Sequence, residues 1–299
     1  YREIYSKTLG RMPKFRAKAR AVELLGKGQI ADLPTAISEL WKNGYDAYAE
    51  NLVCRLFLAT YKDNLKPLFL LSDDGFGMSK IDIVDKWFVL GTDSKARRNV
   101  KPEPKFGLKR RTPMGEKGIG RLSVSYLGSQ LLMLTKEKGE NASALLIDWR
   151  ILENYDFYLD DFNIPMFTFV SNEDFKQQEK LAVEQFLENL NEKLWTEQIK
   201  LRHEILTDWK PFNIPNFLFE EVIDKFCQSD YHGTTFLVFT PQDQLLELSS
   251  IDRVELKNDL GLRYLRTSLS GLHNDLNGSS KDFKTQFFIH DIAGKYNLI

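Results

Sequence analysis

Two glycine-rich turns stand where predicted strands and helices of this chain meet. The first, Asp73-Asp74-Gly75-Phe76-Gly77, directly follows a predicted strand over residues 67–72. The second, Gly115-Glu116-Lys117-Gly118-Ile119-Gly120, precedes a short predicted helix over residues 121–126. Glycine lets the backbone adopt conformations closed to other residues and lets a ligand approach the main chain closely. The chain is therefore expected to form a sheet associated with helices.

The strongest helix signal in the sequence is Asp32-Leu33-Pro34, where an acid at the N-cap precedes a proline in the first turn. It predicts a helix over residues 34–50. Hydrophobic periodicity predicts further helices at about 81–89, 171–200 and 245–269. Apolar runs predict strands at about 52–59, 67–72, 130–135, 143–149, 234–239 and 283–289.

The composition excludes several classes of protein. With 42% hydrophobic and 28% charged residues, the 299-residue chain is expected to be soluble and globular, and not mainly disordered. Forty-one Lys and Arg against forty-two Asp and Glu give a net charge of -1, so the molecule is not a polycation that coats nucleic acid or anionic lipid. Because no run of eighteen apolar residues occurs, no membrane contact is expected.

Cysteine usage bears on the compartment. Cys54 and Cys227 occur in no CxxC or Cys/His spacing, which argues against a structural zinc site and against a disulfide-stapled secreted fold. A cytoplasmic location is the simplest expectation. The sequence begins at Tyr1 with neither an initiator Met nor a signal-peptide core, so we interpret it as part of a longer protein.

Charge is distributed unevenly along the chain. A polar segment from Gly91 onward carries eight basic residues with Glu103 as the only acid among them: Lys95, Arg97, Arg98, Lys101, Lys105, Lys109, Arg110 and Arg111. Residues 151–210 carry thirteen acidic and six basic residues. Because this acidic stretch overlaps a helical pattern, we expect an inserted helical subdomain at about 171–230.

Three polar side chains share one face of the predicted first helix. Glu39, Asn43 and Asp46 are spaced i, i+4 and i+7, so all three project from the same side within about two turns. The spacing alone is also typical of a solvated helix face. The neighbouring motifs favour a site.

The second glycine turn has the features of a phosphate site. Gly115, Gly118 and Gly120 precede a helix, where free backbone N–H groups and the positive helix end can face anionic oxygens. An ordinary loop before a helix is the alternative. The chain has no GxxxxGK[ST], which excludes a P-loop. Gly118-x-Gly120 is not followed by the third glycine of the G-x-G-x-x-G dinucleotide fingerprint.

Four motifs in order resemble the GHKL superfamily of ATPases, which includes DNA gyrase, a heat-shock chaperone, histidine kinases and MutL. They are the segments 39–47, 73–78, 115–120 and the pair Gly233-Thr234. The resemblance spans about residues 30–240 and is closest to the chaperone and MORC-like branch. It implies the Bergerat fold: an α/β (α+β) two-layer sandwich with a mixed β-sheet covered by helices on one face, here with the helical insertion.

The resemblance also implies roles for single residues. Asp73 is similar to the carboxylate that accepts a hydrogen bond from the exocyclic amine of adenine. Thr234 is similar to a strand threonine that supports this contact. Asn43 matches the amide that binds Mg²⁺, and Glu39 matches the residue that orients and activates the attacking water. Asp46 is expected to support the pocket.

The glycine turns complete the implied nucleotide site. Gly75, Gly77 and Met78 would border the adenine. Gly115, Gly118, Ile119 and Gly120 would wrap the phosphates, and residues 91–114 would be the mobile ATP lid. Lys95 and Lys117 are candidate phosphate contacts, although lysines in exposed loops are usually only solvated.

The implied function is a conformational switch driven by ATP. We expect a domain over residues 31–245 that binds and hydrolyses Mg-ATP and forms a homodimer on ATP binding. Residues 1–30 would be an N-terminal arm, and residues 246–299 the start of a coupling domain. The family takes a sensor Lys or Arg from the following domain, and no match is identifiable here, so turnover of the isolated chain is expected to be slow. The switch could act on DNA or on a partner protein, as in a DNA-associated or defence complex.

Two other functions stay open at this stage. Arg202-His203-Glu204 superficially resembles the phosphoacceptor box of histidine kinases. However, His203 follows the ATP motifs, and the kinase helix usually lacks the glutamate found at position 39. The second alternative is a non-hydrolysing, nucleotide-dependent DNA-binding scaffold whose basic lid contacts phosphates.

Overall fold

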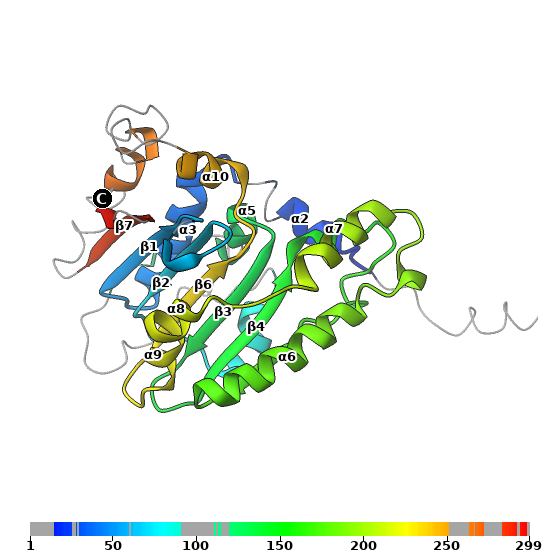
Figure 1. Ribbon diagram of the computed structural model, residues 1–299, viewed down its shortest axis with the longest axis horizontal. Coiled ribbons are helices and arrows are strands. Elements are labelled where there is room, and N and C mark those ends of the chain that lie inside the picture. The colour runs from blue at the N-terminus through cyan, green and yellow to red at the C-terminus, as the bar shows by residue number, and fades with distance from the viewer. Residues whose placement is uncertain are drawn as a thin grey trace, which may run out of the picture.

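The described strands form one mixed sheet (Figure 1). The computed structural model describes residues 15–25, 28, 30–59, 61–90, 111, 113–114, 120–250, 263–265, 267–271, 283–291 and 294–297. The eight strands lie in the order β5-β4-β3-β6-β2-β1-β7-β8. Their bounds are β1 Asn51–Phe57, β2 Leu68–Asp73, β3 Gln130–Lys136, β4 Ala142–Asp148, β5 Met166–Phe169, β6 Gly233–Val238, β7 Lys284–Asp291 and β8 Gly294–Asn297.

All neighbouring strands pair antiparallel except β1 and β7, which pair parallel. The sheet is therefore mixed, as the sequence predicts. The last two strands, β7 and β8, join the same sheet. The domain boundary predicted at residue 245 stays a prediction.

The first long helix, α3, spans Leu33–Asp46. It begins as its sequence predicts: the Asp32 side chain accepts a bond from the Thr35 N–H at 2.9 Å, and Pro34 lies in the first turn. Trp41 and Tyr45 are fully buried on the face that packs against the sheet. Burial of two such aromatic side chains is a major stabilising contribution, about 1.5–3 kcal/mol for each large apolar side chain.

Alternate residues of β1 show what covers each face of the sheet. Leu52 packs against Gly44 of α3, whereas Arg55 forms an ion pair with Glu221 at 3.3 Å. Successive side chains of a strand point to opposite faces, so α3 and the segment around Glu221 lie on opposite sides. The central strands β3, β4 and β6 are buried at every position, which requires cover on both faces.

A helical segment, which the sequence predicts to be an insertion, lies between β5 and β6. Its elements are α6 Asn172–Glu188, η7 Glu192–Leu194, α7 Ile199–Trp209, α8 Asn216–Leu218, η8 Phe219–Ile223 and α9 Asp224–Cys227. The single helix predicted over residues 171–200 is therefore wrong in extent. α6 ends because the Asn189 side chain turns back, accepting from the Asn163 N–H and donating to the Asn163 carbonyl, both at 2.9 Å.

A buried ion network anchors the insertion to the sheet. Asp148, at the end of β4, is fully buried and accepts bonds from Arg150 and from the Trp209 indole N–H at 2.8 Å. Arg150 also donates to Asp208 at 2.8 Å. Because its charges are paired and hydrogen-bonded, the network satisfies groups that would be costly to bury alone.

The remaining helical elements are short. They are α2 Arg20–Leu25, η2 Tyr61–Asp63, α4 Lys80–Asp82, η3 Ile83–Trp87, η5 Gly120–Ser123, α5 Val124–Leu127, η6 Trp149–Glu153 and α10 Asp243–Ser250. Within the predicted N-terminal arm, α2 packs against η6, with Ala19 and Val22 buried. The helix predicted over 81–89 is one turn of α-helix followed by a π-turn.

Candidate functional site

The polar face of α3 points at the start of η5. Glu39 and Asn43 lie one turn apart on the helix, and a Cβ on Gly120 would lie 3.1 Å from Glu39 Oε2 and 3.6 Å from Asn43 Nδ2. The carboxylate, the amide and the Gly120 backbone therefore meet. Glu39 Oε1 accepts a bond from Lys42 Nζ at 2.8 Å. This bond restrains the carboxylate while Oε2 faces Gly120.

Gly44 lets α3 approach the end of β2. A Cβ at this position would lie 2.5 Å from Leu52 Cδ2 and 3.2 Å from the Cβ of Asp73. A larger residue would require the Leu52 side chain or the helix to shift. Since Gly44 directly follows Asn43, the close contact places Asp73 beside the helix that carries Glu39 and Asn43.

Asp73 is the last residue of β2 and is partly buried. The pKa of this carboxyl is raised to about 7, mainly by burial, and the neighbouring charge of Asp74 contributes in the same direction. Backbone N–H groups of Gly75 and Thr234 act in the opposite direction; the Gly75 N–H donates to Oδ1 at 2.9 Å. A carboxyl in this state can accept or donate a hydrogen bond near neutral pH.

The turn after Asp73 is fixed to its surroundings through backbone contacts. A Cβ on Gly75 would lie 2.8 Å from the Ala47 carbonyl, and the Phe76 N–H donates to that same carbonyl at 2.9 Å. Gly77 has φ +65°, and a side chain there would clash with the Lys136 carbonyl of β3. Both glycines are thus required by close backbone approach.

Two buried threonines close the other side of this turn. Thr234 lies opposite Asp73 in the β2–β6 ladder, and its hydroxyl is 3.0 Å from Thr135 Oγ1. Thr135 is fully buried, accepts from the Met78 N–H at 2.9 Å and donates to the Gly233 carbonyl at 3.2 Å. The sequence gives no sign of the role of Thr135, because a threonine in a strand is by default a strand former.

Asp46 supports the segment that leads to the second glycine turn. Its Oδ1 accepts a bond from the Met114 N–H at 2.7 Å. Three residues earlier, Arg111 Nη1 donates to the carbonyls of Tyr45 at 3.1 Å and Ala49 at 2.7 Å. Sequence reasoning missed this contact because Arg111 is the last of eight similar basic residues.

Part of the predicted site lies outside the described residues. This applies to Lys95, Gly115, Lys117, Gly118 and Ile119, and to residues 91–110 of the predicted lid. Their implied phosphate contacts stay predictions. Gly120 is the one residue of the second glycine turn whose surroundings the structure describes.

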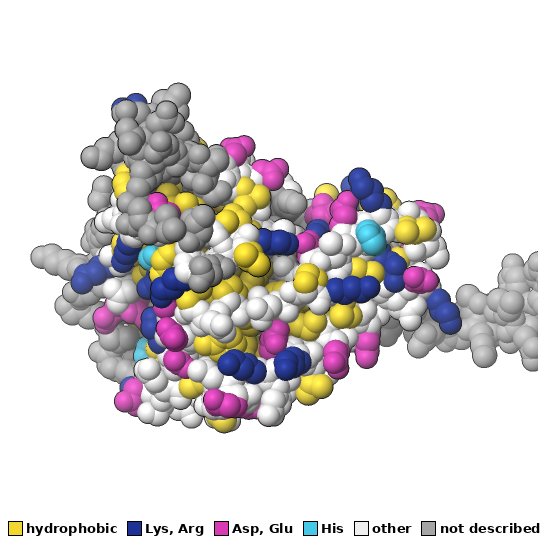
Figure 2. All heavy atoms as spheres, in the orientation of Figure 1, with side chains coloured by type: hydrophobic (Ala, Val, Ile, Leu, Met, Phe, Trp, Pro, Cys, Tyr) yellow, Lys and Arg dark blue, Asp and Glu magenta, His cyan; other side chains and the backbone are white. Residues whose placement is uncertain are grey.

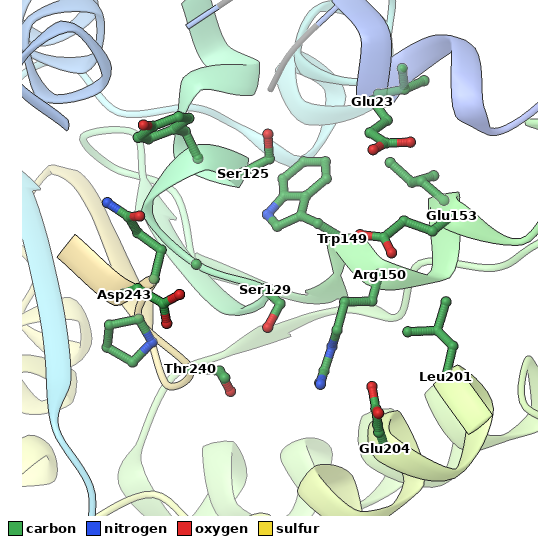
Figure 3. Close-up of a pocket in the computed structure, with 16 residues that line it drawn as sticks. Glu23, Ser125, Ser129, Trp149, Arg150, Glu153, Leu201, Glu204, Thr240 and Asp243 are labelled. Carbon is green, nitrogen blue, oxygen red and sulfur yellow. The ribbon is translucent and has the colours of Figure 1, made fainter. Parts of the chain in front are cut away.

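A separate pocket of about 510 Å³ lies between α2, α5, η6, α7 and the start of α10 (Figure 3). None of the predicted site residues lines it. Four carboxylates line it, namely Glu23, Glu153, Glu204 and Asp243, and its cation Arg150 is already bound by Asp148 and Asp208. Because this lining would repel a triphosphate, the pocket is not a nucleotide site.

The described residues form neither a clustered metal site nor a membrane-spanning helix. Among them, no group of three or more His, Cys, Asp or Glu residues is placed to hold a metal ion. None of the described helices is long and apolar enough to cross a membrane.

Comparison with known proteins identifies the domain. The model of the histidine kinase-, DNA gyrase B- and HSP90-like ATPase family matches residues 31–179. The chain carries a GHKL-type ATPase domain. The match runs from the residue before Asp32, the N-cap of α3, into α6 and includes Glu39, Asn43, Asp73 and Gly120, whereas Thr234 lies beyond it.

The comparisons with solved structures and with curated proteins give less information about this chain than the family model. Among 319 matching chains of solved structures is one described as "Crystal Structure of N terminal domain of a DNA repair protein". It is 14% identical with a TM-score of 0.42, and the match covers 93% of this chain and 54% of that chain. The chain therefore spans about half the length of that structure. No curated protein matches it significantly.

Proposed function

We propose that this chain binds Mg-ATP and hydrolyses it to ADP and phosphate. The observation that carries the proposal is that Glu39 and Asn43 of α3 meet Gly120 of η5. The same helix α3 also packs against Asp73. One helix thereby borders both groups that a nucleotide would need, an adenine contact and a phosphate contact. Membership of the ATPase family supports ATP binding in general.

The adenine end of the site would be bounded by Asp73 and the turn that follows it. The ionised carboxylate accepts a hydrogen bond from the exocyclic amine of adenine, whereas guanine presents a carbonyl oxygen there, which a carboxylate repels. The Thr135 and Thr234 hydroxyls and the bare backbone of Gly77 leave a polar, close-fitting wall beside it.

The phosphate end would be bounded by α3 and Gly120. Asn43 offers an amide oxygen to Mg²⁺, a cation that keeps several waters and takes few protein ligands when phosphates supply the others. Bound there, the metal would neutralise charge on the phosphates.

Glu39 would position the attacking water. Its Oε2, which faces Gly120, accepts a hydrogen bond from the water, and Lys42 holds Oε1. The water oxygen then forms a bond to the γ-phosphorus as the bond to the β-phosphate oxygen breaks, with ADP as leaving group and the water proton passing to solvent or phosphate. An ordinary glutamate is a weak base, so positioning is its main contribution.

Paired variants test the proposal. Glu39→Ala should keep Mg-ATP affinity within about threefold and lose turnover by about a hundredfold or more, whereas Asp73→Asn should lose binding itself. Glu204→Ala, in the separate acidic pocket, is the matched control and should change neither. Equal loss of binding and turnover in both site variants would contradict the two roles.

At the level of the whole protein, we propose an ATP-gated switch of the chaperone and MORC-like branch. Residues 1–30 would serve as the arm that crosses to a second copy, residues 31–245 as the ATP-binding domain, and residues 246–299 as the start of the coupling domain, in a cytoplasmic protein. Sedimentation with a non-hydrolysable ATP analogue tests this: a dimer that forms only with nucleotide supports it, and a monomer under all conditions contradicts it.

A DNA-binding scaffold is the second candidate, favoured by the basic residues between 95 and 111. On the face shown in Figure 2, Lys and Arg side chains of the described residues lie interspersed with Asp and Glu. Arg111 is bonded to α3 and is not available to DNA. A salt titration of DNA binding that gives the same slope after charge reversal of Arg97, Arg98 and Arg110 would remove this candidate.

The histidine kinase alternative receives less support from the structure. His203 lies exposed on α7 within the insertion, where its carbonyl accepts from Thr207 at 2.9 Å. It is a surface residue of an ordinary helix.

A further inference from the structure

The side chain of His232 contacts the first glycine turn from the segment just before β6. The residue is half-buried, and its Nδ1 lies 2.7 Å from the carbonyl oxygen of Gly75. A carbonyl oxygen can only accept a hydrogen bond, so Nδ1 carries a proton and donates it. In the neutral ring this leaves Nε2 unprotonated. The contact therefore fixes both the orientation and the tautomer of the imidazole.

The strand register brings His232 to this place. Asp73 pairs with Thr234 in the antiparallel β2–β6 ladder, so the residue two positions after Asp73 lies opposite the residue two positions before Thr234. These two residues are Gly75 and His232. Between them and the ladder, Gly233 has φ +138°, and a Cβ there would lie 2.2 Å from the Asp73 carbonyl oxygen. The bare backbone of Gly233 therefore allows the close approach that the contact needs.

Gly75 connects His232 to the candidate adenine contact. Its carbonyl accepts from His232, and its own N–H donates to Asp73 Oδ1 at 2.9 Å. The next N–H, that of Phe76, donates to the Ala47 carbonyl at 2.9 Å, so the peptide group between Gly75 and Phe76 is held at both ends. A glycine has no side chain to restrict its dihedral angles. Hydrogen bonds to its neighbours must therefore set the direction of the Gly75 N–H.

The segment that carries His232 is itself anchored to the sheet. Lys136, at the end of β3, is 5% exposed, and its Nζ donates to the carbonyls of Phe226 at 3.0 Å and Gln228 at 2.6 Å. Phe226 also packs against Tyr231, with ring centres 4.8 Å apart. The connection between α9 and β6 is therefore held against β3, and it offers His232 a fixed base from which to hold the turn.

We infer that His232 is a positioning residue whose Nδ1–H holds the Gly75 carbonyl, sets the direction of the Gly75 N–H and thereby orients the Asp73 carboxylate toward adenine. The inference rests on the proposed function for the adenine contact. Its effect falls on binding of the adenine ring, because the contacts that start at His232 end at Asp73.

The ionisation of Asp73 supplies a readout for this role. Burial is the main cause that raises the pKa of Asp73 to about 7; the Gly75 N–H lowers it, and the charge of Asp74 raises it. Tyr231 also faces Asp73, but burial and the charge of Asp73 raise the pKa of Tyr231 to about 12, so the phenol stays neutral near pH 7. Loss of the Gly75 bond should therefore shift the pH dependence of adenosine binding upward.

Adenosine affinity measured between pH 6 and pH 9 tests the inference. In His232→Ala, the midpoint should rise by about 0.5–1 pH unit, which weakens binding about two- to fivefold at pH 7 and leaves it within about twofold of wild type at pH 9. His232→Asn keeps a donor near the position of Nδ1 and does not titrate, so it should retain the wild-type profile. His203→Ala, on exposed α7, is the matched control and should change nothing.

Three outcomes would overturn the inference. An unchanged profile in His232→Ala would show that the bond has no effect on Asp73. An equal loss at every pH would show a merely structural residue. An equal shift in His232→Asn would show that the charge of the ring acts, and not its hydrogen bond.

Measurements on the nucleotide-free protein test the contact without relying on adenosine. Nitrogen–proton NMR correlations should show Nδ1 of His232 protonated in the neutral ring, and amide exchange in peptides over residues 74–78 should be faster in His232→Ala but not in His232→Asn. A neutral ring protonated at Nε2 would overturn the inference. If the wild-type protein binds neither adenosine nor Mg-ATP, the proposed function fails, and the ring tautomer still decides whether His232 holds Gly75.

Discussion

Oε2 of Glu39 lies 3.1 Å from the position that a Cβ on Gly120 would occupy. This relationship joins two motifs that are about eighty residues apart in the sequence: a polar helix face and the last glycine of a phosphate-loop pattern. Asn43 borders the same space at 3.6 Å. The arrangement brings an acid, an amide and a bare backbone together.

A methyl group in that space should impair the site without unfolding the protein. Gly120→Ala is expected to lower kcat with Mg-ATP at least tenfold, because the new Cβ crowds the Glu39 carboxylate and the Asn43 amide. Steady-state kinetics and circular dichroism measure the two effects. Gly271→Ala, where a Cβ meets nothing within 4 Å, is the control. Unchanged kinetics in Gly120→Ala would show that this space is not used.

The pH dependence of adenosine binding should report Asp73. Because burial raises the pKa of Asp73 to about 7, and the ionised form accepts the adenine amine, affinity should be highest above pH 7. Below that value, protonation competes with binding, and affinity falls about tenfold per pH unit. Adenosine is the right probe because it carries no titrating phosphate. A flat profile from pH 5 to pH 8 would contradict the assignment.

Thr135 should contribute to stability and nucleotide binding as much as Thr234, the motif residue beside it. Thr135→Val removes the hydroxyl that accepts from Met78 N–H and donates to the Gly233 carbonyl. Leaving such buried groups without partners costs about 1–3 kcal/mol, so we expect lower stability and weaker nucleotide binding. Denaturant unfolding measures the stability, and calorimetry measures the nucleotide binding. Thr168→Val, exposed on β5, should change the free energy of unfolding by less than about 0.5 kcal/mol.

The ion network of Asp148, Arg150 and Asp208 should be needed for stability and not for nucleotide binding or hydrolysis. Arg150→Met leaves Asp148 buried without its cation, a change that typically costs about 3–5 kcal/mol. The midpoint of denaturant unfolding should fall accordingly. In the fraction that stays folded, adenosine affinity should equal that of wild type. A large loss of adenosine affinity in folded protein would connect the insertion to the nucleotide site.

The sequence predicts the elements of the fold better than their ends. The signal at Asp32 and Pro34 places α3 within a few residues, because capping depends on local chemistry. The break between α6 and α7 depends on the tertiary bonds between Asn189 and Asn163, which no periodicity contains. The four residues of β5 are too few for a pattern to be recognised.

For the candidate site, the motifs predict which residues meet better than what supports them. Glu39, Asn43 and Gly120 are visible because each belongs to a spaced motif. Gly44 and Arg111 are not, since one looks like a weak spot in a helix and the other like one of eight loop cations. Their roles depend on contacts between α3 and segments distant in sequence.

A series of three ligands tests the central claim, which is that a single nucleotide contacts Asp73 at one end and α3 at the other. Calorimetry would measure adenosine, ADP and Mg-ATP binding to wild type, Asp73→Asn and Asn43→Ala. The account predicts that Asp73→Asn weakens all three ligands by a similar factor, whereas Asn43→Ala weakens Mg-ATP and leaves adenosine unchanged. Adenosine binding that survives in Asp73→Asn, or that is lost in Asn43→Ala, would contradict it.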